Sequence, residues 1–309
     1  MINSKTNIFT WFSTTSIRRA GQSRNLLKII TLNFGKNNTF TPEIAILSTN
    51  LNVPFFSELY IPGYVYMKKT NLMLETLQQL DQQLLLTLNG LHSPYWDSFM
   101  WLFTGRFIWI PMYATILYIL CKNFNVYVTL LTAVAIALTI TYADQLCATW
   151  IRPAVERLRP SNLNNPLSEF VHIVNGKRGG SYGFPSCHAS NSFGLAFFLL
   201  FFFRQRWLSI FILCWAVLNC YTRIYLGVHY PGDLLAGMFV GLSGALIFYY
   251  LLRYTLRQKK IAGLLKYDEH NRYLIEHPKE IAHTRLTIYI GLITTGIIAT
   301  ISPLITLHP

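Results

Sequence analysis

The chain has 309 residues, of which 52% are hydrophobic and only 13% are charged, and its formal net charge is +13. An ordinary soluble domain has roughly 25% charged residues, so this composition excludes a typical soluble protein and favours a bundle of membrane-spanning helices. The basic residues are spread among loops between apolar stretches, which argues against a nucleic-acid partner. The five cysteines form no CxxC pair, so neither a disulfide framework nor a zinc site is expected.

The first 66 residues differ in character from the rest of the chain, because they are rich in Asn, Thr and Ser. They have no steady periodicity and no apolar core of a signal peptide, which predicts a disordered tail. Met67 followed by two lysines suggests an alternative, in which translation starts there and residues 1–66 are a mis-assigned start. Both alternatives stay open at this point.

Residues 67–104 are predicted to form an amphipathic interfacial segment. Within this segment Met73, Leu77, Leu80 and Leu84 recur at spacings of three or four, with Gln and Asp between them. This spacing places the apolar side chains on one face of a helix, and such a helix lies on a membrane rather than crossing it.

Six long apolar stretches follow, and several approach the roughly 20 residues that a helix needs to cross a bilayer. They lie at residues 105–121, 125–150, 188–203, 207–226, 232–254 and 284–306. We therefore predict an all-α polytopic membrane helical bundle, with six transmembrane helices plus the N-terminal amphipathic interfacial helix. Residues 105–254 make a core of five spans, and residues 255–309 make a cytoplasmic loop and the last span. The first and third stretches are short for a span, and we expect the first to be extended from Trp96.

The distribution of basic residues predicts the orientation of the spans. Arg204 and Arg206 lie in one turn, and five Lys or Arg residues lie in the loop 253–266, which falls on the same side if the spans alternate. The positive-inside rule makes that side cytoplasmic. The loops 151–187 and 227–231 then face outward, which in a Gram-negative cell is the periplasmic face of the inner membrane.

Three clusters of polar residues lie in these outward loops. They are Arg152 with Arg159-Pro160, the run Pro185-Ser186-Cys187-His188, and Arg223 with His229 and Asp233. Arginine offers a planar fork of donors that matches phosphate, so three converging arginines predict an oxyanion cage. The run that ends at His188 opens a helix, whose free backbone N–H groups also favour an anion.

The spacing of His229 and Asp233 indicates a nucleophile. The two residues lie four apart where a helix begins, so the carboxylate can accept the N–H of one imidazole nitrogen and leave the other nitrogen free to attack. His188, on a different span, can protonate the departing alkoxide, which predicts covalent phosphoryl transfer. The loop 151–187 offers only Glu156 and Glu169, without metal-ligand spacing, so we expect no metal and no other cofactor.

These clusters resemble the signature motifs of the type 2 phosphatidic acid phosphatase and vanadium haloperoxidase superfamily. Its usual pattern is Lys-x6-Arg-Pro, then Pro-Ser-Gly-His, then Ser-Arg-x5-His-x3-Asp, and the resemblance covers about residues 72–254. Arg152, Cys187 and Thr222 stand here where the pattern has Lys, Gly and Ser. The resemblance implies a nucleophile, its partner and a general acid at His229, Asp233 and His188. It implies phosphate ligands at Arg152, Arg159, Ser186, Cys187 and Arg223.

The expected function is that of an integral membrane lipid phosphatase that forms a phosphohistidine without a metal. The sequence around the motifs is similar to that of bacterial membrane members of this superfamily, including lipid A phosphatases. The resemblance implies lipid A, undecaprenyl pyrophosphate, phosphatidylglycerol phosphate or phosphatidic acid as substrate, with the bilayer as the other partner. Alternatives are a lipid phosphotransferase with the same site, a membrane transporter and a vanadium haloperoxidase. The sequence does not predict an oligomeric state.

Two further charged residues receive structural interpretations. Arg157 falls outside the motif spacing, so we interpret it as part of a solvated or lipid-binding rim. Asp144 lies inside an apolar stretch, where an ionisable group is costly and usually paired, and Arg106 is its candidate partner. Lys177 and Arg178, in a Gly-rich loop, either contact the lipid headgroup or are simply solvated.

Overall fold

The computed structural model describes residues 9–19, 22–34, 40–45, 62–305 and 307 of the chain. The chain divides into two compact units, Met1–Lys68 and Lys69–Pro309.

In the first unit three strands pair into an antiparallel sheet in the order β1-β2-β3. The strands are β1 (Phe9–Arg19), β2 (Gln22–Phe34) and β3 (Phe40–Ala45). The register pairs Phe9 with Leu32 and Phe34 with Phe40. Their Thr, Ile and aromatic residues are those that favour strands. These strands lie within residues 1–66, for which the disordered tail and the mis-assigned start both stay predictions.

The described part of the second unit is helical, which confirms the all-α prediction for the membrane part of the chain. The principal helices are α1 (Pro62–Asn89, which begins in the first unit), α2 (Pro94–Phe103), α3 (Ile110–Asn123), α4 (Val126–Gln145), α6 (Cys187–Phe203), α7 (Arg206–Tyr225), α8 (Pro231–Arg257) and α11 (Arg285–Ile301). A π-helical segment, Leu146–Ile151, joins α4 to the short α5 (Arg152–Val155), and α9 (Lys259–Leu264) and α10 (Glu269–Glu276) follow α8.

The described helices include four that are long and apolar enough to cross a membrane, rather than the six predicted. They are Val126–Val155, Arg206–Tyr225, Pro231–Arg257 and Arg285–Leu304. The segment from Trp96 does not extend the first stretch as one straight helix, because α2 and the helix Phe107–Asn123 are bent by 68°. Together they would make a fifth span. Helix α6 has only 17 residues, which at 1.5 Å per residue is shorter than the roughly 30 Å hydrocarbon core.

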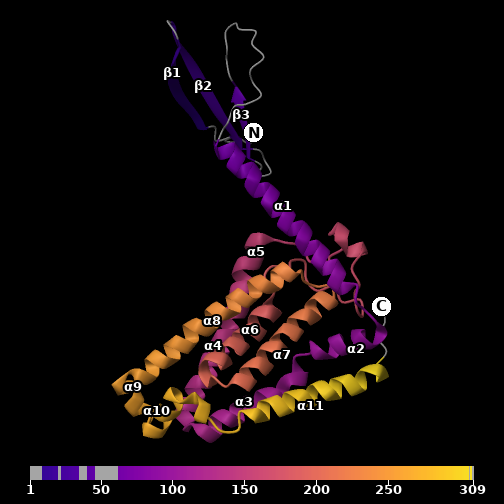
Figure 1. Cartoon of the computed structure of the whole chain (residues 1–309), viewed down its shortest axis with the longest axis vertical. Helices are drawn as coiled ribbons and strands as arrows, with labels where there is room; N and C mark the ends of the chain where they lie inside the picture. The colour runs from indigo at the N-terminus through magenta and orange to yellow at the C-terminus, as the bar shows by residue number, and fades with distance from the viewer. Residues whose placement is uncertain (1–8, 20–21, 35–39, 46–61, 306, 308–309) are drawn as a thin grey trace, which may run out of the picture. The chain divides into compact units, whose positions relative to one another are not determined.

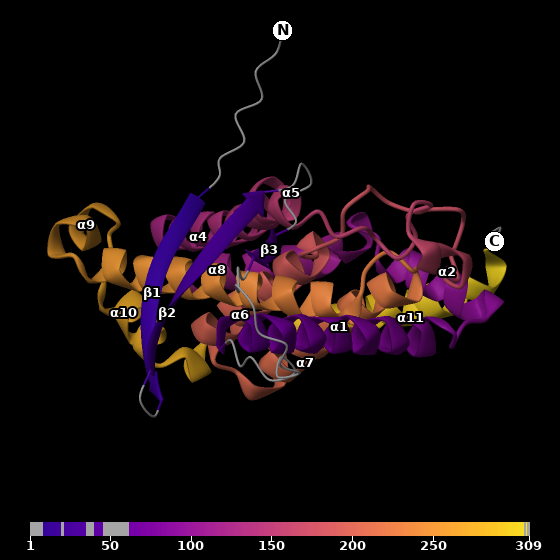
Figure 2. The ribbon, with the colours of Figure 1, turned by 90° about the horizontal axis from the view of Figure 1, so that it is seen from above.

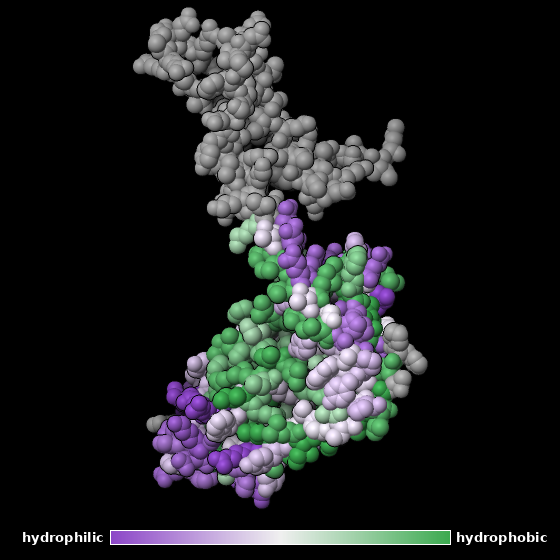
Figure 3. Space-filling model, turned by 45° about the vertical axis from the view of Figure 1, so that its right-hand side comes forward, coloured by the Kyte–Doolittle hydropathy of each residue, from purple (hydrophilic) through white to green (hydrophobic). Residues whose placement is uncertain are grey.

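The surface of the second unit agrees with a membrane protein. Large apolar side chains are exposed along the long helices, among them Phe239 on α8, which is 62% exposed, and Leu130 on α4. Figure 3 shows hydrophobic surface over the middle of the helices and hydrophilic residues gathered at the lower end of the view. Lipid tails solvate such side chains, so their exposure is stable in a bilayer.

Helices α4, α6, α7 and α8 run side by side, and α6 packs against the other three (Figures 1 and 2). The closest approach is between α6 and α8, where glycines replace larger side chains. A Cβ at Gly237 would overlap the carbonyl oxygen of Ser186, and one at Gly241 would overlap that of Ser190. Small residues at this spacing let two helix backbones meet directly. The first turn of α8 is thereby held beside the first turn of α6.

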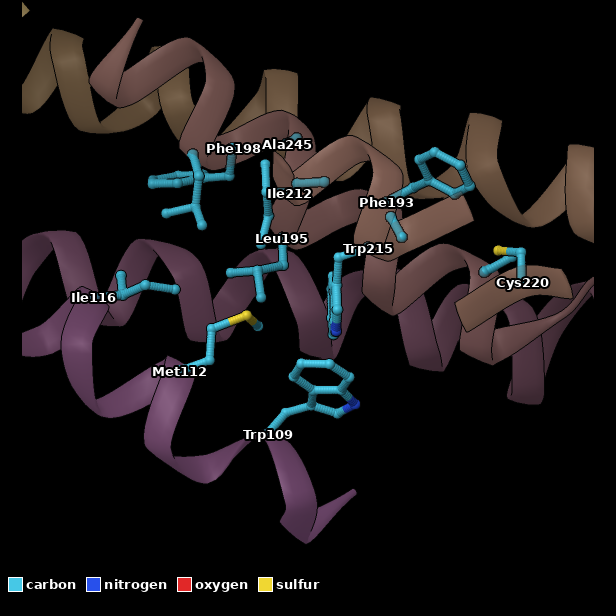
Figure 4. Packing of buried hydrophobic residues seen from close by; sticks show 14 of the residues in the cluster. Trp109, Met112, Ile116, Phe193, Leu195, Phe198, Ile212, Trp215, Cys220 and Ala245 are labelled. Carbon is cyan, nitrogen blue, oxygen red and sulfur yellow. The ribbon is translucent and has the colours of Figure 1, made fainter. Parts of the chain in front are cut away.

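An aromatic core lies between α3, α6 and α7. Trp109 and Trp215 are both buried, and their rings meet edge to face with centroids 5.6 Å apart (Figure 4). The indole N–H of Trp109 donates to the carbonyl oxygen of Phe103, 2.9 Å away, across the bend between α2 and α3. This bond satisfies the polar atom of a buried ring and holds the bend in place.

Candidate active site

A short extended segment of the loop after α5 places two arginine side chains on the same side. Leu158 and Tyr182 form an isolated antiparallel bridge, and the N–H of Arg159 donates to the carbonyl oxygen of Ser181, 3.0 Å away. Successive side chains of an extended segment point to opposite sides. Arg157 and Arg159, two positions apart, therefore extend from the same side of this segment.

His229 and Asp233 meet at the start of α8. His229 precedes Pro231, the first residue of the helix, and Asp233 lies in the first turn. The Nδ1 atom of His229 is 3.3 Å from Oδ2 of Asp233, and the same oxygen accepts the backbone N–H of Tyr230 at 3.0 Å. Both side chains are buried, and that of Asp233 has no exposed surface. The carboxylate thus caps the helix and orients the imidazole at once.

The contacts of His229 identify its tautomer. Nη1 of Arg159 lies 2.8 Å from Nε2 of His229, and a guanidinium can only donate. Nε2 must therefore be the unprotonated nitrogen, and the ring proton must sit on Nδ1, where it is donated to Asp233. Burial, with the positive charges of Arg159 and Arg223, holds the pKa of His229 well below its usual value. The imidazole is therefore neutral at neutral pH.

Three arginines line one cavity of about 660 Å³ together with His188 and His229. The Nε atoms of Arg152, Arg159 and Arg223 are buried and have no hydrogen-bond partner within the described part of the chain. Unpaired buried donors are costly, and an anion with several oxygens would satisfy them. The structure thus brings the predicted arginines and both histidines to one concave site.

Local contacts hold these arginines in place. Nη2 of Arg152 lies 3.0 Å from both the carbonyl oxygen of Pro185 and Sγ of Cys187. Nη1 of Arg223 donates to Oγ1 of Thr104, also 3.0 Å away. Burial and the neighbouring Arg152 lower the pKa of Arg159 to about 10, which leaves it charged at neutral pH. All three side chains therefore present positive charge to the cavity.

Ser186 has a different position from the one expected of a phosphate ligand. Its side chain is fully buried and does not line the cavity. The hydroxyl oxygen accepts the N–H of Ala189 at 3.5 Å as the cap of α6, and the backbone N–H of Ser186 donates to the carbonyl oxygen of Asp233. The hydroxyl is occupied by its own helix, because a residue at this position turns its side chain back onto the first turn.

Arg157 is not a solvated rim residue, and that interpretation was wrong. Its Nη1 donates to Oδ1 of Asp233 at 2.8 Å and its Nη2 donates to Oδ2 of Asp81 at 2.6 Å. Asp81 lies on α1, 76 residues away in the sequence, so no local motif spacing connects the two. One signal was present in the sequence, since Arg157 is two positions before Arg159 in a segment that leads into a proline and is therefore extended.

Asp144 also has a different partner from the one expected. Its Oδ1 accepts the amide of Asn191 on α6 at 3.2 Å. Arg106 instead lines the arginine-rich cavity, as does Lys177, whose ammonium lies 5.2 Å from the centroid of the Trp101 ring. The cavity therefore carries two basic side chains beyond the three arginines of the motifs. Within the described residues, no group of three or more His, Cys, Asp and Glu side chains is placed to hold a metal ion.

The chain is similar to proteins of one known family. Residues 126–257 match the family model of the PAP2 superfamily. The chain is 63% identical over 179 residues to the Lipid A 4'-phosphatase of Bacteroides thetaiotaomicron. The matched residues make up 58% of this chain and 80% of that protein. It is 34% identical over 169 residues to the Lipid A 4'-phosphatase of Porphyromonas gingivalis, covering 55% and 71%.

A more distant relative is the Undecaprenyl-diphosphatase of Sulfolobus acidocaldarius, 31% identical over 156 residues, which is 50% of this chain and 66% of that protein. No solved structure matches the chain. The family match, the extent of these similarities and the apolar helices lead to one conclusion. The chain belongs to the PAP2 superfamily and is a membrane lipid phosphatase of that type.

Proposed function

We propose that the chain hydrolyses the phosphate monoester of lipid A or a closely related lipid through a phosphohistidine on His229. The single observation that carries the proposal is the orientation of His229, whose unprotonated Nε2 lies in a cavity with three arginines while Nδ1 is held by Asp233. Two relatives named Lipid A 4'-phosphatase support the choice of lipid.

The chemistry follows from this orientation. The lone pair of Nε2 attacks phosphorus, the phosphorus–oxygen bond to the lipid breaks, and the departing alkoxide takes a proton from His188. The arginines stabilise the charge on the three remaining phosphoryl oxygens, and Asp233 stabilises the positive ring. His188 then takes a proton from a water molecule whose oxygen attacks phosphorus. The nitrogen–phosphorus bond breaks and inorganic phosphate leaves.

A second cavity supports an amphiphile as the substrate. Its volume is about 820 Å³, and it shares Arg106, Cys187 and His188 with the arginine-lined cavity. From there its lining passes between α3, α4, α6 and α7 to Leu120 and Leu195, and most of it is apolar. A lipid can thus keep a chain at bilayer depth while its phosphate lies against His229.

The distribution of charge supports a site on the outer face of the inner membrane. His229 precedes the first residue of α8, whereas Arg253 and Arg257 lie in its last turns. A helix of 27 residues is about 40 Å long, which is enough to separate its two ends across a bilayer. If the basic end is cytoplasmic, the site opens to the periplasm.

The test measures phosphate release by the purified, detergent-solubilised protein with EDTA present. The substrates are lipid A, undecaprenyl pyrophosphate, phosphatidylglycerol phosphate and phosphatidic acid. The variants are His229→Ala and, as a matched control, His270→Ala, because His270 is exposed on α10. We expect release from lipid A that survives EDTA, is lost in His229→Ala and is retained in His270→Ala. No release from any lipid by folded protein would refute the proposal, and a phosphorylated alcohol as product would indicate transfer instead of hydrolysis.

A further inference from the structure

Arg157 lies between two carboxylates that come from different parts of the chain. It donates one hydrogen bond to Asp233 and another to Asp81, at 2.8 and 2.6 Å. The side chain of Arg157 is 24% exposed, while those of Asp81 and Asp233 are 13% and 0% exposed. The guanidinium therefore bridges α1 and the catalytic end of α8 in a largely buried position.

Asp81 also contacts α8 directly. Its Oδ1 accepts the backbone N–H of Gly232 at 2.7 Å, next to Asp233 in the chain. A Cβ at Gly232 would come within 2.8 Å of Oδ2 of Asp81, so only glycine lets the carboxylate approach this closely. Asp81 is thus fixed by the first turn of α8 as well as by Arg157.

A third contact orients the plane of the guanidinium. Arg157 lies over the ring of Tyr230, with its central carbon 3.9 Å from the ring centroid. The hydroxyl of Tyr230 in turn accepts the amide of Asn165 at 2.8 Å, which fixes the ring. A guanidinium stacked on an aromatic face and bonded at both ends has little freedom to move.

This arrangement divides the two oxygens of Asp233 between two tasks. Oδ1 accepts from Arg157, while Oδ2 faces Nδ1 of His229 and accepts from Tyr230. We propose that Arg157 and Asp81 are positioning residues for the histidine chemistry. They hold the carboxylate in the orientation that keeps the proton of His229 on Nδ1 and leaves Nε2 unprotonated. The inference rests on the proposed function of His229, and it assigns a part in catalysis to α1, which precedes the segment that matches the family model.

The kinetic test compares Arg157→Gln, Asp81→Asn and the double variant with the wild type. The control is Glu75→Gln, because Glu75 is an exposed acid on the same helix. Loss of an outer residue that orients a reacting group costs about 10 to 100-fold, by analogy with residues that orient metal ligands. We expect such a loss in kcat with KM changed less than about threefold, and partial recovery in Arg157→Lys. The kcat of the double variant should be about equal to that of the slower single variant, because Arg157 and Asp81 act through the same carboxylate, that of Asp233.

A spectroscopic test does not depend on turnover. In protein labelled with ¹⁵N-histidine, the nitrogen shifts of His229, assigned by their loss in His229→Ala, report which ring nitrogen carries the proton. We expect the Nδ1–H form in the wild type and in Glu75→Gln, and a mixture of tautomers in Arg157→Gln and Asp81→Asn. If the wild-type protein releases no phosphate, the proposed function fails. The nitrogen shifts of His229 still show whether Arg157 controls the tautomer of that histidine.

Some outcomes would overturn the inference. Wild-type kcat together with the wild-type His229 signal in both single variants would do so. A lowered melting temperature without a change in either readout would also do so, because it would indicate a purely structural role. Asp81→Asn conserves the shape of the side chain, so it decides the question if Arg157→Gln does not fold.

Discussion

Replacing Asp233 with Asn should separate the orientation of His229 from the presence of its neighbours. The carboxylate accepts from three groups, namely the backbone of Tyr230, Arg157 and Nδ1–H of His229. An amide of the same shape keeps one acceptor oxygen and turns an NH₂ donor toward another donor. In the Ser-His-Asp triad the corresponding change lowers kcat by about 10⁴, because the histidine takes the wrong tautomer. At 1.36 kcal/mol per factor of ten, that loss is about 5 kcal/mol of activation free energy.

We expect a loss of about 10³ to 10⁴ in kcat for Asp233→Asn toward the preferred lipid. The largely buried charge of Arg157 also loses one of its two carboxylate partners, so the melting temperature should fall. The assay is phosphate release over a range of substrate concentrations, beside thermal unfolding in the same detergent. A variant that keeps kcat within about threefold of the wild type would refute the assignment of Asp233 as the partner of His229.

Three other predictions concern packing, pH and the lipid chain. Gly241→Ala should lower the melting temperature through about 1–3 kcal/mol of overpacking against α6, whereas Gly296→Ala, with open space around it, should not. Because the pKa of folded His229 lies below its unfolded value of about 6.5, its contribution to stability is complete above that pH and is lost as the pH falls. The acid limb of kcat/KM should likewise lie below pH 6.5, and a limb at or above that value would contradict the neutral imidazole. Ala137→Trp, which fills the apolar cavity, should lower kcat/KM about tenfold for a long-chain lipid but not for a short soluble phosphate ester. Equal effects of Leu138→Trp, which lies outside the cavity, would refute the chain-binding role.

The residues proposed to carry the chemistry could be found from their spacing because each cluster is local in the sequence. Arg223, His229 and Asp233 lie within one span end and the following helix start, and the structure brings them to one site with His188 and Arg159. The exception is Ser186, whose hydroxyl is taken by its own helix. A motif identifies which residue stands at a position, but the direction of its side chain depends on the local hydrogen bonds.

The number of spans could not be read from the apolar stretches alone. The stretch 188–203 already had the short length of α6, which spans Cys187–Phe203. Hydropathy does not report the bend of 68° between α2 and the helix Phe107–Asn123, however. The indole N–H of Trp109 donates to the carbonyl oxygen of Phe103 across this bend, and hydropathy does not encode such a contact.

The sequence by itself determined the class of this protein. Its composition predicted a membrane helical bundle, and three motifs at fixed spacings predicted an arginine cage with a His-Asp pair, since both depend on residue identity and local distance along the chain. Only the tertiary structure decided which nitrogen of His229 is unprotonated, and that Arg157 links Asp81 to Asp233. Asp81 and Arg157 are 76 residues apart, and no periodicity or spacing encodes a contact that forms only when α1 packs beside the start of α8.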